Sequence, residues 1–184
     1  LHLLAPPLSG YHDLNNMFGN ESFDCDPTGC SDIQNANSGT GFYVESDGSP
    51  LDFTFTGNVL SDKTLILQEG WNLIGNPLVT QFDVNSIIIT FNNTDFNWLD
   101  AAKYGYISPT PIIYDNEKAS HVGTESLSTA AGFWVHSFYD ELEISFIPSG
   151  SSTATAPEIG DSSYWNLSLF AKENTENYGN IFDE

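Results

Sequence analysis

Two parts of the chain share one sequence pattern, and this internal repeat constrains the fold more than any other feature. Residues 1–15, LHLLAPPLSGYHDLN, align without a gap with residues 71–85, WNLIGNPLVTQFDVN, at an offset of 70. A second block, GFYVES at residues 41–46, returns as GFWVHS at residues 132–137, at an offset of 91. Because both blocks occur in the same order in the two copies, we expect a duplicated structural unit.

The second copy is longer than the first, since its two blocks stand 21 residues further apart, and the extra residues are expected mainly between 92 and 129. After the second block, LDFTF at residues 51–55 matches LEISF at residues 142–146. Apolar and polar residues alternate there, as in a half-buried strand. Turn residues precede both segments, so we expect two equivalent hairpins, residues 43–45 with 51–56 and residues 130–137 with 141–147.

Short strands separated by turns predict an all-β protein, an antiparallel β-sandwich or jelly roll built from two pseudo-repeated halves. The duplicated module is expected over residues 1–148, with halves at 1–69 and 70–148. Residues 10–40 are polar and predict a loop with one helical turn near 14–18. The sequence PSGSSTATAP around residues 149–157 is typical of a linker. Residues 158–184 then begin a following β module or form an exchanged strand with an acidic tail.

The chain is strongly acidic, with 25 Asp or Glu against four Lys or Arg and a formal charge of −21. Nucleic-acid binding requires a cationic surface, so this composition argues against it and against anionic lipid. No apolar run reaches the roughly 18 residues of a membrane-spanning helix. Such a charge suits a saline or calcium-containing exterior, where cations relieve self-repulsion, although solubility alone also explains it.

Cys25 and Cys30 are the only cysteines, in the sequence CDPTGC. Pro27 and Gly29 favour a turn that brings the sulfur atoms together, which predicts a disulfide and an exported protein. Zinc is the alternative, but it would need two further ligands nearby. The acidic residues around this loop could bind calcium through clustered carboxylates, or they could simply be solvated. The candidate calcium ligands are Asp24, Asp26 and Asp32.

No arrangement of residues predicts catalysis. The four histidines are scattered, and no nucleophile stands at a recognisable spacing from a base. With so many acidic residues, the sequence cannot single out a catalytic pair of carboxylates. We therefore expect a protein that is not an enzyme and that needs no cofactor other than, at most, calcium.

Aromatic residues in the second copy's insertion suggest carbohydrate binding, because sugars stack on exposed rings beside acid or amide groups. In the alternative interpretation these rings seal a long loop onto the sheet. Trp71 and Trp134 lie in the repeated strand blocks and are expected in the core. The candidate ligand-binding residues are Trp98, Tyr104, Tyr106, Tyr114 and Asp100.

The string GWNLIGNP at residues 70–77, followed by AGFWV at 131–135, resembles a β-rich module of secreted Bacteroidetes proteins that are substrates of the type IX secretion system. In that family the module often precedes the C-terminal sorting domain. Residues 3–10, 39–44 and 55–57 resemble its first half, so the resemblance covers about residues 1–148. The chain departs from the family at Leu78-Val79-Thr80, where an aromatic residue and a second proline are usual. The resemblance implies export to the cell surface within a larger protein and implies no reaction.

Two functions are therefore predicted for an extracellular, non-catalytic chain. The first is a structural or adhesive unit of a large secreted protein or fibre, whose partners are neighbouring modules. The strand expected after the linker could add to a neighbour's sheet edge in that case. The second is a carbohydrate-binding module that accompanies a secreted hydrolase and has a polysaccharide as its partner.

Overall fold

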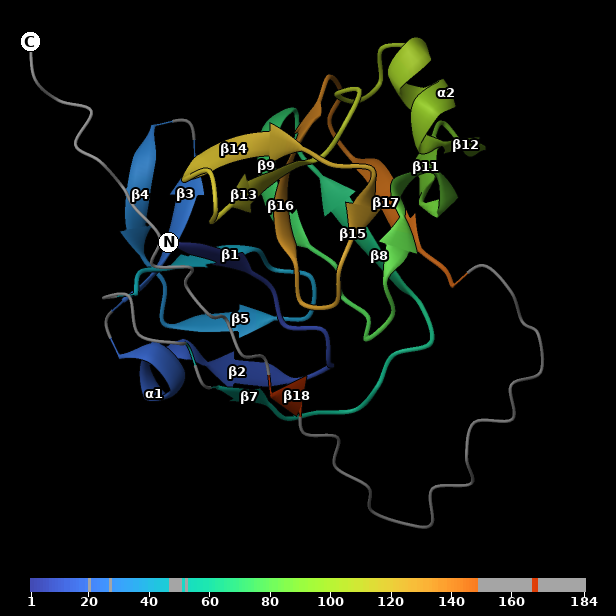
Figure 1. Ribbon diagram of the computed structural model, residues 1–184. Coiled ribbons are helices and arrows are strands. Elements are labelled where there is room, and N and C mark those ends of the chain that lie inside the picture. The colour runs from blue at the N-terminus through green and yellow to red at the C-terminus, as the bar shows by residue number, and fades with distance from the viewer. Residues whose placement is uncertain (20, 27, 47–50, 52, 149–166, 169–184) are drawn as a thin grey trace, which may run out of the picture.

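The computed structural model describes residues 1–148, apart from residues 20, 27, 47–50 and 52, together with the backbone of residues 167 and 168. Short antiparallel strands dominate the described part (Figure 1), which confirms the all-β class. The helical elements are short: α1 (Leu14–Phe18), the 3-10 helix η1 (Val84–Ser86) and α2 (Trp98–Lys103). The first half of the chain and the second half form two neighbouring bodies, drawn in blue and in green to orange.

Each half contains a four-stranded antiparallel sheet, and the two sheets have the same topology. The first has the order β1-β6-β3-β4, and the second has the order β14-β13-β16-β9, which is the same order read from the other edge. The strands of the first sheet are β1 (His2–Leu4), β3 (Ser22–Asp26), β4 (Gly29–Asp32) and β6 (Phe42–Val44). Those of the second are β9 (Gly70–Gly75), β13 (Ile112–Asp115), β14 (Ser120–Gly123) and β16 (Gly132–Ser137).

Strand register shows that the two outer sheets are equivalent residue by residue. Leu3 pairs with Tyr43 in the first sheet, and their sequence equivalents Leu73 and Trp134 pair in the second. A slip of one residue would turn every side chain to the other face, so matching registers mean matching faces. The sheets also match in β3 and β13, where Phe23 pairs with Tyr43 and Ile112 pairs with Trp134.

Each half also contains a two-stranded ribbon, and sequence-equivalent residues pair in the two ribbons. His12 pairs with Ala36 between β2 (Tyr11–Asp13) and β5 (Asn35–Asn37). Their equivalents Phe82 and Leu127 pair between β10 (Phe82–Asp83) and β15 (Ser126–Leu127). The residue after each pair, Asp13 or Asp83, then caps a helical turn by accepting a backbone N–H bond, at 3.0 and 2.8 Å.

The second half is a two-layered sandwich. Its second sheet has the order β12-β11-β17-β8, and large apolar side chains fill the space between the two layers, among them Phe133 from β16 and Ile144 from β17. The strands of this sheet are β8 (Lys63–Leu67), β11 (Ile88–Phe91), β12 (Thr94–Asn97) and β17 (Leu142–Phe146). Although β8 precedes Gly70, it therefore belongs to the sheet of the second half.

The first half has a smaller second layer. It consists of β7 (Thr54–Phe55), which pairs with β18 (Leu167–Ser168). A separate core of Leu8, Leu14, Phe42, Phe53 and Phe55 fills the space beside it.

The halves meet around a pseudo-two-fold axis, because contacts between them occur in pairs with the roles exchanged. Leu4 bridges to Ala131, and the equivalent residues Ile74 and Thr40 also form a bridge. Likewise the Ala5 amide donates to the Ala130 carbonyl, while the Gly75 amide donates to the Gly39 carbonyl, at 2.9 and 3.0 Å. An interface that pairs the same patches of two units is isologous.

Two predictions about the elements are wrong. The expected hairpins do not form, because β6 and β16 pair within the outer sheets whereas β7 and β17 pair within the second layers. Residues 10–40, expected as a loop, contain four strands, β2 to β5. Their polar composition misled the prediction because these short strands carry exposed residues: all four residues of β4 are exposed.

The insertion overlaps the predicted range, residues 92–129, but begins before it. Ile112 is the equivalent of Phe23, so the numbering offset between the two copies has grown from 70 to 89 at the start of β13. Two extra residues in the β13–β14 turn then raise the offset to 91. The extra residues therefore form β11, β12 and α2, and the β13–β14 hairpin is the counterpart of β3–β4. The predicted linker and most of the predicted tail lie outside the described residues, and the predicted domain boundaries stay predictions.

Candidate functional site

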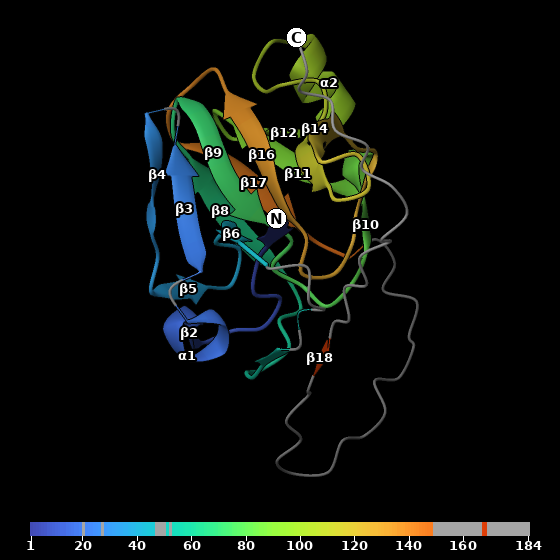
Figure 2. The same ribbon diagram turned by 60° about the vertical axis from the view of Figure 1, so that its left-hand side comes forward.

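A pocket of about 470 Å³ opens between the two four-stranded sheets, close to the pseudo-two-fold axis. Figure 2 shows β3 of the first sheet beside β9 of the second. Most of the residues that line the pocket are equivalent pairs, one from each half. These pairs are Leu1 and Trp71, Phe23 and Ile112, Tyr43 and Trp134, and Cys30 and His121.

Strand alternation explains why large aromatic rings face this pocket instead of the core. In β16, Phe133 and Val135 point into the core of the second half, so Trp134, between them, points to the opposite face. Trp71 lies on the same face of the neighbouring strand β9 and is 41% exposed. The expectation that Trp71 and Trp134 belong to the core is therefore wrong, because both faces of these strands are apolar.

The polar atoms at the base of the pocket form one hydrogen-bonded chain. Trp134 Nε1 donates to the Tyr43 hydroxyl at 2.7 Å, and that hydroxyl lies 2.6 Å from His121 Nε2. The indole N–H can only donate, so the Tyr43 hydroxyl accepts from Trp134 and shares a second hydrogen bond with His121 Nε2. Burial raises the pKa of Tyr43, with a hydrogen bond from Trp134 acting in the opposite direction. Tyr43 is therefore a neutral phenol at physiological pH.

The β3–β4 hairpin forms one wall of the pocket, and the predicted disulfide crosses it. Cys25 and Cys30 are directly paired in register with their Cα atoms 4.1 Å apart and their sulfur atoms bonded. Since neither cysteine is free, zinc ligation by these thiols is excluded. Tyr114 and His121 occupy the equivalent positions in the β13–β14 hairpin, where their rings pack edge to face at 5.3 Å.

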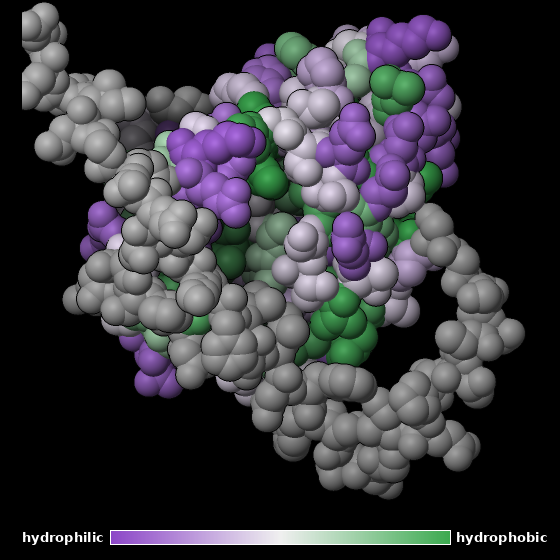
Figure 3. Space-filling view, viewed as in Figure 1, coloured by the Kyte–Doolittle hydropathy of each residue, from purple (hydrophilic) through white to green (hydrophobic). Residues whose placement is uncertain are grey.

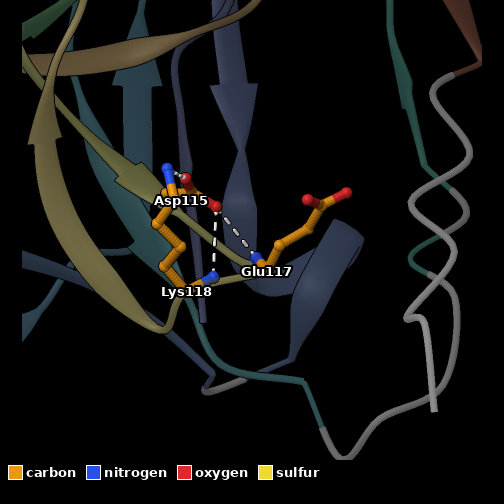
Figure 4. Close-up of polar contacts among 3 residues, drawn as sticks. All are labelled: Asp115, Glu117 and Lys118. Carbon is orange, nitrogen blue, oxygen red and sulfur yellow. Dashed lines mark hydrogen bonds and ion pairs between the residues drawn. The ribbon is translucent and has the colours of Figure 1, made fainter. Parts of the chain in front are cut away.

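An aspartate closes the turn of each hairpin. Asp26 Oδ1 accepts from the backbone N–H groups of Thr28 and Gly29 and from the Thr28 hydroxyl. The Thr28 hydrogen bonds lower the pKa of Asp26, which therefore stays ionised at neutral pH. Its equivalent, Asp115, accepts from the amides of Glu117 and Lys118 and forms an ion pair with Lys118 at 2.9 Å (Figure 4).

The candidate calcium ligands do not converge on one point. Asp24 and Asp26 lie on one face of β3, whereas Asp32 pairs with Phe23 and so shares the opposite face. Desolvation raises the pKa of Asp24. In the described part of the chain, no group of three or more His, Cys, Asp or Glu side chains is arranged to hold a metal ion. Calcium binding stays a prediction.

The candidate carbohydrate ligands separate into four places. Trp98 is buried in the core of the second half, where its Nε1 donates to the Ser108 carbonyl, so it seals the inserted segment onto the sandwich. Asp100 accepts from the Asn97 side chain at the start of α2. Tyr114 lies beside His121, whereas Tyr104 and Tyr106 stack on each other at the surface.

Tyr104 and Tyr106 belong to a larger group that we call the surface aromatic cluster. Tyr104 is 61% exposed and Tyr139 is 43% exposed, and Tyr106 lies between them in contact with both. The residues of the cluster are Phe91, Phe96, Tyr104, Tyr106 and Tyr139. Sequence reasoning missed Phe91 and Tyr139 because they lie outside the predicted insertion, residues 92–129, and it overlooked Phe96, which lies inside it.

The fold and the pocket together define an all-β protein of two pseudo-symmetric halves with an aromatic pocket between their sheets. No known protein family, curated protein or solved structure matches the chain in comparisons of its sequence and fold. Among the described residues, no helix has the length and apolar character needed to cross a membrane.

Proposed function

We propose that this chain is a non-catalytic extracellular module, a structural or adhesive unit of a larger secreted protein that joins its neighbours by strand addition. The resemblance to modules of type IX secretion substrates and the disulfide support a location outside the cytoplasm. The strongly acidic composition is compatible with a saline exterior.

One observation carries the adhesive role: β7 receives a strand from beyond residue 148. Ser168 pairs with Thr54 of β7, just as Thr64 of β8 pairs with Ser145 of β17, and Thr54 and Ser145 are repeat equivalents. The second half thus takes its edge strand from the segment just before Gly70, whereas the first half takes it from the far end of the chain. A strand that reaches its site through a long connection can also be supplied by another copy, as in β-augmentation.

Cysteine pairs at these positions test the proposal. The double variant Thr54→Cys/Ser168→Cys should crosslink within one chain, and a mixture of the two single variants at high concentration should yield crosslinked dimers on a non-reducing gel. Thr64→Cys/Ser145→Cys is the matched control, because the hydroxyl oxygens at those positions are already 2.8 Å apart. If the mixture stays monomeric while the control crosslinks, neighbours do not exchange this strand and the adhesive role by strand addition is refuted.

The surface aromatic cluster supports a second candidate, a carbohydrate-binding module that serves a secreted hydrolase. Exposed rings such as Tyr104 offer the platform on which sugar rings stack. Co-sedimentation with insoluble polysaccharides tests this role. Binding should be lost in Tyr104→Ala and Tyr106→Ala and kept in Trp71→Ala, whose indole lies in the other site. Absence of binding to every polysaccharide would reject the second candidate.

A further inference from the structure

The pocket on the pseudo-two-fold axis has the size of a small-molecule site. Its volume of about 470 Å³ lies within the range of pockets that bind small ligands. It is open at the rim, where Leu1 and Trp71 are 38% and 41% exposed, and closed at the base by Tyr43, which is only 3% exposed. A ligand that enters would therefore contact buried and exposed rings together.

The arrangement of rings suits a compact apolar ligand. The indoles of Trp71 and Trp134 stand nearly perpendicular, at 87° with centroids 6.4 Å apart, and so form a corner. Phe23 and Tyr43, from the first half, stack on each other at 5.6 Å. Four aromatic side chains from four strands, two in each sheet, thus surround one space.

The polar groups in the base disfavour a neutral polar ligand such as a sugar. Trp134 Nε1 and the Tyr43 hydroxyl are already hydrogen-bonded in the chain that ends at His121. Sugar hydroxyls would lose their hydrogen bonds to water on entering, and these donors offer no replacement. A ligand that needs no hydrogen bonds avoids this cost.

The charges around the pocket favour a cation. Asp26 is among the residues that line it, although its side chain is held in the turn on the opposite face of β3 from Phe23, and Asp32 shares the face of Phe23. In the opposite hairpin the positive charge of Lys118 is paired with Asp115. The whole chain carries a formal charge of −21, so its field attracts organic cations and repels anions.

We propose that this pocket binds a quaternary ammonium group, held against the rings of Trp71, Trp134, Tyr43 and Phe23 by cation–π attraction. A trimethylammonium group is apolar on its surface, carries a positive charge and makes no hydrogen bonds, so it matches each property of the pocket. The site is separate from β7 and from the surface aromatic cluster, so this inference is independent of the proposed function.

Choline and its uncharged isostere 3,3-dimethylbutan-1-ol provide the test, with the full chain titrated at low salt and followed by tryptophan fluorescence and by NMR. Choline should bind about tenfold more tightly than the isostere, a difference within the range of cation–π energies. Equal binding of the two compounds, or no choline binding at millimolar concentration, would overturn the proposal.

Three variants locate the binding. Trp71→Leu keeps apolar surface but removes the ring, so it should abolish the preference for choline over the isostere, while Trp71→Phe should retain much of it. Because Trp71 is partly exposed, both variants should fold, which circular dichroism checks. Tyr104→Ala, in the surface aromatic cluster, is the control and should bind choline normally. Unchanged choline preference in Trp71→Leu would refute the assignment.

Discussion

Gly75 and Ala5 are repeat equivalents that touch each other across the pseudo-two-fold axis. A Cβ atom on Gly75 would lie 2.0 Å from the Cβ of Ala5, far closer than two carbon atoms can approach. Gly75 is therefore required by packing, and it marks a close approach between the two halves. The same close approach recurs at Gly41 and Gly132, whose Cβ atoms would each meet a carbonyl oxygen at 2.6 Å.

Exchanging these two residues tests the contact. Gly75→Ala should destabilise the protein by about 1–3 kcal/mol through overpacking. Adding Ala5→Gly should recover much of that loss, because the pair then occupies a similar volume with its members interchanged. Urea unfolding of the wild type, both single variants and the double variant gives the coupling energy. Additive effects of the two substitutions would contradict the contact.

Tyr43 should make stability depend on pH in the alkaline range. Its pKa in the folded protein is raised above 10.0, so the unfolded chain loses the phenol proton at a lower pH than the folded chain. The stability from this group is present below pH 10 and is lost as the pH rises through the folded-state pKa.

Tyr43→Phe isolates this contribution, since phenylalanine has no proton to lose. The variant should be less stable at neutral pH, by about 1 kcal/mol, because the Trp134 N–H loses its acceptor. Its stability should fall less steeply than that of the wild type between pH 9 and pH 11. Urea midpoints over that range provide the measurement, and parallel curves for the two proteins would rule out a role for Tyr43.

Features that depend only on residues close together in the sequence could be predicted. The disulfide followed from two cysteines beside turn-forming residues, and the helical turn after Asp13 followed from local pattern. The pocket could not be predicted in this way, because Tyr43, Trp71 and His121 come from distant strands. The available signal was that Trp134 alternates with Phe133 and Val135, so that all three cannot face one core.

At the scale of elements, the equivalent hairpins β3–β4 and β13–β14 are each held together by a cross-strand side-chain contact, but the two contacts differ in chemistry. A disulfide joins the β3–β4 pair at Cys25 and Cys30, and ring packing joins the β13–β14 pair at Tyr114 and His121. Aspartates at equivalent positions close both turns, although the second turn is two residues longer. The two hairpins therefore keep the same strand pairing although the side chains at the paired positions differ.

Because the registers match, the disulfide can be transplanted. Tyr114→Cys/His121→Cys should form a second disulfide, detected by mass spectrometry and by free-thiol titration. Tyr114→Cys/Val122→Cys is the control and should stay reduced, since the two side chains point to opposite faces of the hairpin. A second bond that fails to form would show that the two hairpins differ in backbone geometry.

Reduction of the native disulfide should cost roughly 2 kcal/mol, the chain-entropy value for so short a loop. Urea unfolding with and without a phosphine reductant measures it. The variant Cys25→Ser/Cys30→Ser should be insensitive to the reductant, and an equally large reductant effect on this variant would contradict the assignment.

Pairing between elements was the weakest part of the sequence prediction. In each half the sequence has two consecutive apolar segments separated by turn-forming residues, which is the pattern of a hairpin. The structure instead places β16 in one layer and β17 in the other, because both strands bury residues in the same core from opposite sides. Apolar pattern alone cannot distinguish a turn within one sheet from a crossing between two sheets.

At the scale of the whole molecule, negative charge is the dominant electrostatic feature. The face of the molecule seen in Figure 3 mixes hydrophilic regions with separate hydrophobic patches. With 25 acidic residues against four basic ones, the folded state concentrates like charges that unfolding would separate. Screening by salt reduces that repulsion.

Stability should therefore rise with ionic strength. The urea midpoint is expected to be higher in 500 mM than in 10 mM sodium chloride, and the gain should shrink when exposed acidic residues are neutralised. A triple variant, Glu69→Gln/Glu125→Gln/Glu143→Gln, serves for the comparison. A midpoint that falls with added salt would show that attractive ion pairs outweigh the net repulsion.

The paired bridges from Leu4 to Ala131 and from Ile74 to Thr40 carry an evolutionary consequence. A polypeptide with a single copy would offer both surfaces of this interface to an identical subunit and close into a homodimer. Tandem fusion of the two genes would remove the dependence of assembly on concentration. It would also free the subunits to diverge, leaving a cystine on one wall of the shared cavity and an imidazole on the other.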